Sequence, residues 1–115
     1  MIAVLFEVSL KPGHEQRYLD LAAGLRPYLE RIDGFISVER FQSVTDEGKY
    51  LSLSFFKDET ALDEWRRQPA HRGAQEAGRS IVFEKYRLRV ASVIRNYGMF
   101  KRDESPLNSR EVHSG

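Results

Sequence analysis

Several residues in the second half of the chain could together abstract a proton and bind a small molecule. His71 is a candidate general base, because histidine titrates near neutral pH. Arg79 could stabilise the anion that proton removal leaves, and Arg87 is an alternative cation for the same role. Gln75 joins them as a candidate binding residue, and three aromatic side chains could supply the walls of an apolar pocket: Trp65, Phe83 and Tyr86.

Each of these side chains also has a purely structural interpretation. His71 follows Pro69 by two residues and could cap a turn or lie on the surface. Trp65 completes the apolar stripe of its predicted helix, and Tyr86 lies on the face of its predicted strand that carries the apolar residues. Both could therefore be core residues. Arg79 could be solvated at a helix end.

Basic side chains alternate along the last predicted strand, at Lys85, Arg87, Arg89 and Arg95. This basic stripe could bind an anion. It could also form salt bridges across an interface between two copies of the chain, with Glu7 and Glu39 as partners. The second interpretation is favoured, because glutamates inside strands need partners and are then poor candidates for an acid–base pair.

Other kinds of site are excluded by residue type and spacing. The chain has no cysteine, which excludes disulfides, thiolate catalysis, zinc knuckles and iron–sulfur clusters. It contains no glycine-rich phosphate loop and no H-E-x-x-H motif, and its three isolated histidines give no metal-ligand spacing, so we expect no metal site. Eighteen basic and seventeen acidic residues leave a net charge of +1, which argues against a nucleic-acid partner.

Periodicity predicts the elements that must position these residues. Apolar residues that alternate predict strands, and apolar residues spaced three or four apart predict helices. The predicted order is strand 2–10, helix 14–30, strands 35–43 and 49–56, helical segments from Asp58 and from Pro69 to Ala77, and strand 81–95. Pro27 is expected to kink or restart the first helix. Gly78 is expected to end the last one. The long last strand is expected either to bend at a bulge near Ala91 or to run past its own sheet.

This order predicts an α+β, ferredoxin-like βαββαβ fold, a four-stranded antiparallel sheet with the helices on one face. The other face would expose more apolar side chains than a monomer normally does. A fifteen-residue last strand would span about 50 Å and overrun its own sheet. Both features predict a homodimer.

The length of 115 residues fits one domain, which we place at residues 1–98, followed by a polar tail at 99–115 that we expect to be flexible. No apolar run reaches 18 residues, so no membrane span is expected. The first residues, Met1–Phe6, are typical of a strand rather than of a signal peptide, which makes the cytoplasm the expected location.

Over residues 2–98 the chain resembles the antibiotic biosynthesis monooxygenase superfamily of dimeric α+β barrels. The resemblance rests on Lys11-Pro12-Gly13 after the first strand, Asp33-Gly34-Phe35 before the second, and the runs 65–71, 74–79 and 83–90. It implies a homodimer with an apolar pocket between helices and sheet. Some members use that pocket to oxygenate polycyclic phenols or anthrones with O2, without metal, flavin or nicotinamide. Other members oxidise quinols.

One branch of the superfamily binds and degrades haem, and the chain departs from its pattern. Trp65 matches that branch's tryptophan, but the positions nine and ten residues later, where its haem ligand lies, are Ala74 and Gln75. The first strand also lacks the branch's asparagine, since Phe6 or Glu7 stands there. Haem binding through His71 is therefore the less favoured alternative.

The sequence thus predicts a cofactor-independent monooxygenase that oxidises an aromatic or quinol-like small molecule. His71 would be the base and Arg79 the anion stabiliser, and the substrate would be bound by Trp65, Gln75, Phe83 and Tyr86. A non-catalytic ligand-binding or stress-response dimer with the same pocket is the alternative, as is a purely structural dimer.

Overall fold

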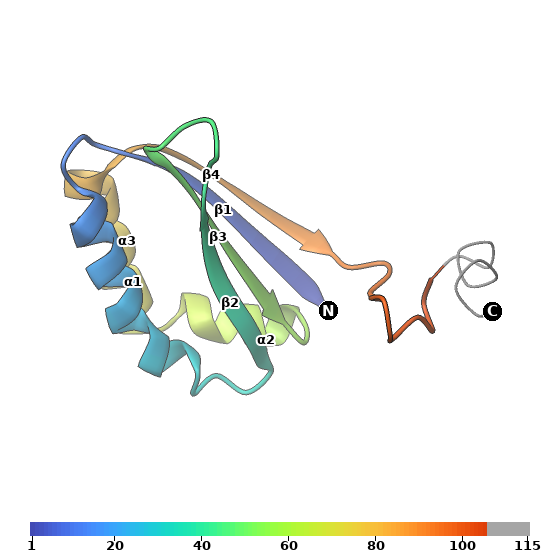
Figure 1. Ribbon diagram of the computed structural model, residues 1–115. Helices are drawn as coiled ribbons and strands as arrows, with labels where there is room; N and C mark the ends of the chain where they lie inside the picture. Colours follow the sequence, from blue (N-terminus) through green and yellow to red (C-terminus); the bar gives the residue numbers. More distant parts are fainter. Residues whose placement is uncertain (106–115) are drawn as a thin grey trace.

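The computed structural model describes residues 1–105, in which four strands form one antiparallel sheet and the helices cover one of its faces (Figure 1). The elements are β1 (Ile2–Leu10), α1 (Glu15–Leu29), β2 (Phe35–Gln42), β3 (Lys49–Phe56), α2 (Glu59–Arg66), α3 (Pro69–Ala77), a π-helical turn (Gly78–Val82) and β4 (Phe83–Ser92). The strand order is β2-β3-β1-β4, with antiparallel neighbours throughout. This confirms the predicted ferredoxin-like βαββαβ fold.

The register places the even-numbered residues of the central strands on the face that the helices cover. Val4 pairs with Ser54 on one side and with Val90 on the other. The buried side chains on this face form two clusters. The Trp65 cluster consists of Leu29, Ile32, Val38, Phe56, Ala61, Leu62 and Trp65, and the Tyr18 cluster of Val8, Leu10, Tyr18, Tyr50 and Val82.

The opposite face of the sheet has no helix over it among the described residues. The register places apolar side chains there: Leu5, Phe41, Leu51, Leu53 and Phe55. Charged side chains surround them, and Glu7 Oε2 lies 3.3 Å from Arg89 Nη1 and 3.9 Å from Lys49 Nζ. Arg89 of the basic stripe is therefore paired with Glu7 within one chain, whereas the salt bridges predicted across an interface between two copies stay a prediction.

The end of the chain departs from prediction in two ways. The last strand has ten residues rather than fifteen, because residues 78–82 form a π-helical turn and pairing ends at Ser92. The bulge expected near Ala91 is wrong, since the register shift falls between Ser9 and Leu10 of β1.

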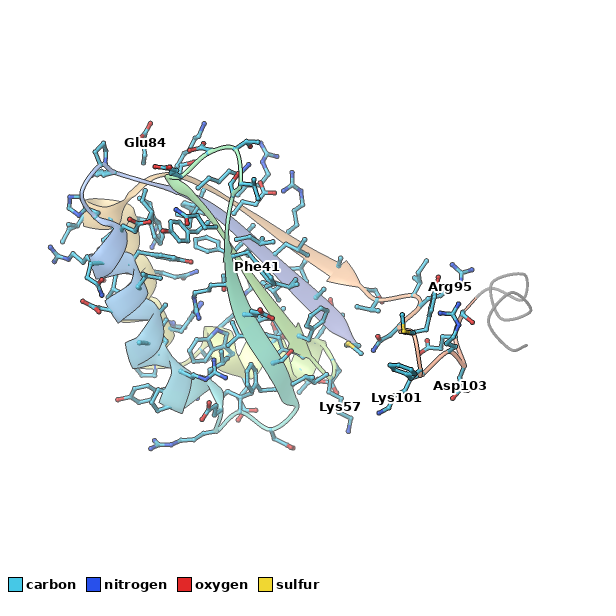
Figure 2. The ribbon with its side chains drawn as sticks, in the orientation of Figure 1. Phe41, Lys57, Glu84, Arg95, Lys101 and Asp103 are labelled. Atoms are coloured by element: carbon cyan, nitrogen blue, oxygen red, sulfur yellow. The ribbon has the colours of Figure 1, made fainter. Side chains whose placement is uncertain are left out.

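After β4 the chain leaves the sheet. One hydrogen bond, Val93 N to Met1 O at 3.0 Å, continues the pairing. The segment 94–105 then runs away from the helices as an arm, on which Figure 2 labels Arg95, Lys101 and Asp103. The radius of gyration of 16.7 Å exceeds the roughly 13 Å typical of a compact chain of this length. Ile94 is 81% exposed and Phe100 is 92% exposed on this arm. The rest of the predicted tail, 106–115, lies outside the described residues.

Helix α2 begins where the sequence predicted, and this sets the position of Trp65. Asp58 is its N-cap, and Asp58 Oδ1 accepts from the Ala61 backbone N–H at 2.9 Å. Helix α1 runs through Pro27 to Leu29, so proline does not end it. No helix among residues 1–105 is both long enough and apolar enough to cross a bilayer.

Helix α3 ends at Ala77 with Gly78 as its C-cap, as predicted, although the φ of Gly78 is right-handed at −59° and the chain continues into the π-helical turn. The requirement for glycine at this position comes from packing. A Cβ at Gly78 would lie 2.5 Å from a ring carbon of Phe83. That ring is fixed by Phe6, Tyr18 and Tyr86, with ring centroids 5.5–6.2 Å away.

We predict that Gly78→Ala lowers the free energy of unfolding by about 1–3 kcal/mol, since the confined Phe83 ring must shift. Gly73→Ala is the matched control, because nothing lies within 4 Å of a Cβ at that helical position. It should stabilise the protein by up to about 1 kcal/mol. Urea denaturation of both variants measures the difference, and equal stabilities would contradict the packing argument.

Candidate functional site

A cavity of about 610 Å³ lies between the sheet and the three helices. The cavity is present because the side chains of β3 that face the helices are large at the two ends of the strand and small in its middle. Tyr50 and Phe56 belong to the two buried clusters, whereas Ser52 and Ser54 between them line the cavity. Its volume is within the range of small-molecule sites, and most of its lining is apolar.

Trp65 and His71 form one wall of this cavity, with ring centroids 4.9 Å apart. Trp65 is 8% exposed and belongs to a buried cluster, so its core interpretation is confirmed. It also lines the cavity, so one side chain stabilises α2 against the sheet and presents an aromatic surface to a ligand.

The surroundings of His71 favour the neutral form of its imidazole. Burial lowers the pKa of His71, a hydrogen bond to the backbone of Arg66 opposes this, and the charge of Arg66 lowers the pKa further. His71 Nδ1 is buried and has no hydrogen-bond partner among the described residues. A neutral imidazole with an unpartnered nitrogen at a cavity wall can accept a proton from a bound molecule.

The charge of the cavity lining is positive. Four arginines contribute to it, Arg40, Arg66, Arg67 and Arg72, and the one acidic side chain among the described lining residues is Asp63. Asp63 Oδ1 lies 3.9 Å from Arg66 Nη1, and both side chains are more than half exposed. This distant pair leaves most of the positive charge uncompensated, which favours an anionic ligand or an anionic intermediate.

Two polar residues of the lining were not predicted from the sequence as site residues. Tyr18 comes from α1 and Arg40 from β2, and the Tyr18 hydroxyl and Arg40 Nε are buried without hydrogen-bond partners among the described residues. Burial raises the pKa of Tyr18, while the Arg40 guanidinium beside it opposes the rise. Arg40 has the same parity as Val38, whose burial in the structure shows that this side of β2 faces the helices.

The structure brings together four of the six residues predicted for the site. Trp65, His71, Gln75 and Phe83 line the cavity. Arg79 and Tyr86 are not among its lining residues. Arg79 is exposed in the π-helical turn, and the Tyr86 ring packs against Phe6 on the sheet with centroids 5.5 Å apart. The anion-stabilising role predicted for Arg79 has no support in this arrangement, and the nearby Arg66 suits it better.

The residues that the structure describes contain no group of three or more histidine, aspartate or glutamate side chains placed to hold a metal ion. The polar groups of the cavity lining are an imidazole, guanidinium groups, hydroxyls, one amide, one carboxylate and the indole N–H of Trp65.

Comparison with known proteins places the chain in a family. The family model described as antibiotic biosynthesis monooxygenase matches residues 1–77. A Pyricularia oryzae protein named Jasmonate monooxygenase ABM is 47% identical over 93 residues, which are 81% of this chain and 43% of the fungal protein. The chain thus matches less than half the length of that relative. Bacillus subtilis YqjZ, an uncharacterised protein, is 31% identical over 93 residues, 81% of this chain and 79% of YqjZ.

Solved structures share the fold at low sequence identity. Rv0793 of Mycobacterium tuberculosis superposes with a TM-score of 0.76 at 16% identity, covering 84% of this chain and 98% of its own. A conserved protein of Methanosarcina mazei superposes with a TM-score of 0.72 at 19% identity, covering 78% and 89%. These likenesses concern the fold alone.

We predict that the imidazole of His71 titrates below the ordinary histidine value of about 6.5. The unfolded chain then binds this proton more readily than the folded one, so stability decreases as the pH falls below about 6.5. Imidazole NMR signals followed from pH 4 to 8 give the midpoint, and His71→Gln identifies the signal by removing it. A midpoint at or above 6.5 would contradict the prediction.

Proposed function

Because the chain belongs to the antibiotic biosynthesis monooxygenase family, we propose that it is a monooxygenase that oxidises an aromatic or quinol-like small molecule with O2 and without metal, flavin or nicotinamide. The observation that carries this proposal is the neutral His71 imidazole with its unpartnered nitrogen at the wall of a mostly apolar cavity. The name of the fungal relative, a monooxygenase, supports the same reaction type.

The proposed reaction begins when His71 removes a proton from a phenol or an activated carbon of the substrate. The electron-rich anion transfers one electron to O2, the two radicals combine at carbon, and the hydroperoxide loses water. For a methylene substrate the product is a ketone. One oxygen atom stays in the product and the other leaves as water, and the substrate supplies all four electrons, so no external reductant is required.

The surroundings of His71 suit each requirement of this sequence. The charge of Arg66, which lowers the pKa of His71, would also stabilise a substrate anion beside it. The Trp65 ring, 4.9 Å from the imidazole centroid, gives an aromatic substrate a surface to stack on. The apolar remainder of the lining limits water, which protects the anion from reprotonation.

We also propose that the protein acts as a homodimer, with a second copy covering the helix-free face of the sheet. Near the middle of that face, Leu53 has Glu39 beside it on β2, and on the other side Leu5 separates it from Arg89 of the basic stripe. A face that carries both charges can pair with itself about a two-fold axis, so that acidic groups of one copy meet basic groups of the other. The exposed arm, with Ile94 and Phe100, offers further apolar surface for the same contact.

Non-catalytic ligand binding by a dimer is the second candidate function. The presence of the cavity supports ligand binding as well as it supports oxygenation. The two functions differ in whether a bound aromatic molecule is consumed. Haem binding is a third outcome that a haem titration would reveal, through a shifted Soret band that His71→Ala abolishes.

We predict that protein treated with chelator takes up O2 with at least one compound from a panel of anthrones, dihydroquinones and naphthols. His71→Ala should reduce kcat by about 10²–10⁴-fold, the usual contribution of a general base. His14→Ala is the control and should retain full turnover, since His14 precedes α1 and does not line the cavity.

Each result of this oxygen-electrode experiment has a distinct meaning. Uptake that His71→Ala leaves unchanged would retain the oxygenase function and discard the proposed base. Binding of panel compounds without uptake would favour the ligand-binding dimer.

We predict that sedimentation velocity shows a particle of twice the chain mass and that Leu53→Glu converts it to the monomer. The substitution places a charge among the apolar residues of the helix-free face, opposite Leu5 and Glu39. Leu19→Glu is the matched control, because Leu19 is an exposed leucine on helix α1. A wild-type monomer, or equal dissociation in both variants, would contradict the proposed interface.

A further inference from the structure

Arg40 and Tyr18 present polar atoms to the cavity that the protein itself does not satisfy. The Nε of Arg40 and the hydroxyl of Tyr18 are each buried without a hydrogen-bond partner among residues 1–105. The two groups lie beside each other. Burial raises the pKa of the Tyr18 phenol, and the Arg40 guanidinium opposes this rise by its charge and by a side-chain contact that falls short of a full hydrogen bond. A buried donor without an acceptor costs about 1–3 kcal/mol, and more when it is charged, so such a pair suggests a missing anionic partner.

No acidic side chain of the described chain fills that place. Arg40 takes part in none of the ion pairs among the described residues. The one acidic residue of the lining, Asp63, has Arg66 as its neighbour. The guanidinium thus lies at the edge of an apolar cavity with its charge uncompensated, which is typical of a site that is neutralised by a ligand.

The surrounding packing holds these groups in a fixed arrangement. Arg40 is directly opposite Ser52 on the neighbouring strand, and Ser52 also lines the cavity, so a hydroxyl flanks the guanidinium. The Tyr18 ring packs against Tyr50 and Phe83, with centroids 5.5 and 6.2 Å away. Arginine, serine and tyrosine thus offer several hydrogen-bond donors on one part of the cavity wall.

We propose that Arg40, with Tyr18 and Ser52, binds the carboxylate of an amphipathic small molecule whose apolar body fills the cavity. A single guanidinium matches a carboxylate through two parallel N–H···O bonds. One guanidinium balances the single charge of a carboxylate, whereas a phosphate dianion beside Arg40 would keep a net negative charge. The remaining lining of this part of the cavity is apolar and includes Phe6, Leu88 and Val90, which suits a hydrocarbon or aromatic body.

This carboxylate anchor is separate from the proposed base. Tyr18 belongs to one buried cluster, and Trp65, which contacts His71, belongs to the other. A ligand held by its carboxylate at Arg40 would extend its apolar body along the cavity toward the wall that carries His71. The anchor deepens the proposed function by naming the substrate class, yet it concerns binding alone and does not require oxygenation.

The test is a pair of matched ligands, 4-phenylbutanoate and the neutral 4-phenylbutanamide, measured by calorimetry and by the fluorescence of Trp65. Trp65 is the one tryptophan of the chain and lines the cavity, so its emission reports binding there. The acid should bind at least tenfold more tightly than the amide, and octanoate should likewise bind more tightly than octanamide. Both acids should change the Trp65 emission.

Substitutions at the anchor should remove the preference for the acid. Arg40→Met should weaken binding of the acid at least tenfold and leave that of the amide within about twofold. Arg40→Lys should retain part of the preference, and Tyr18→Phe should weaken the acid several-fold while keeping the ring contacts. Arg95→Met is the control, because Arg95 lies on the arm far from the helices (Figure 2), and it should change nothing.

Several outcomes would overturn the anchor. The proposal fails if acid and amide bind equally, if no acid binds below 1 mM, or if Arg40→Met keeps the preference. Binding of acids without any change in Trp65 emission would place them elsewhere and overturn it too. If the acids bind as predicted but no compound of the oxygen-uptake panel is oxidised, the proposed oxygenation fails and the binding site stands.

Discussion

The alternation of large and small side chains along β3 is the constraint on which the cavity depends. Tyr50 and Phe56 extend toward the helices at the two ends of this central strand and pack into the two buried clusters. Ser52 and Ser54 between them are too small to reach the helices. The helices are therefore supported at two places and span the gap between them. Leucine or phenylalanine at both serines would close this space and convert the fold to a filled core.

An open cavity of this kind reduces stability, so the packing around it must be firm. The interior loses dispersion contacts along the cavity wall, and buried polar atoms on Tyr18, Arg40 and His71 have no hydrogen-bond partner within residues 1–105. The two buried clusters and the close contact of Gly78 with the Phe83 ring offset that cost. Departures from good packing that collect at one place in an otherwise regular fold are typical of a functional site.

Much of the fold could be predicted from the sequence because its signals are local. Alternation fixed the strands 35–42 and 49–56 to within a residue, and the Asp58 cap and Pro69 marked the starts of α2 and α3. The length of β4 could not be read in this way, since the residues before Phe83 alternate as a strand does but form a π-helical turn. The turn brings Gly78 within reach of the Phe83 ring, a contact that the strand pattern of the sequence does not show.

The site was only partly predictable, and for a similar reason. Trp65, His71, Gln75 and Phe83 stood out by residue type and do line the cavity. Tyr18 and Arg40 were hidden, because a tyrosine in an apolar helical stripe and an arginine in a strand look like core and surface residues. Only the register, which aligns Arg40 with Ser52 under the helices, shows that this charge faces inward.

Separation of the anchor from the base has a consequence for how such a fold can acquire different substrates. The backbone and the two clusters fix the cavity whatever lines it, so the residue at position 40 can change without loss of the fold. His71 and Trp65 are tied to the α2–α3 junction, where packing and chemistry share the same side chains. Reaction type would then be set at the helices and substrate class at the sheet. An arginine at position 40 selects for an anionic end group, because a neutral ligand would leave its charge buried and unpaired.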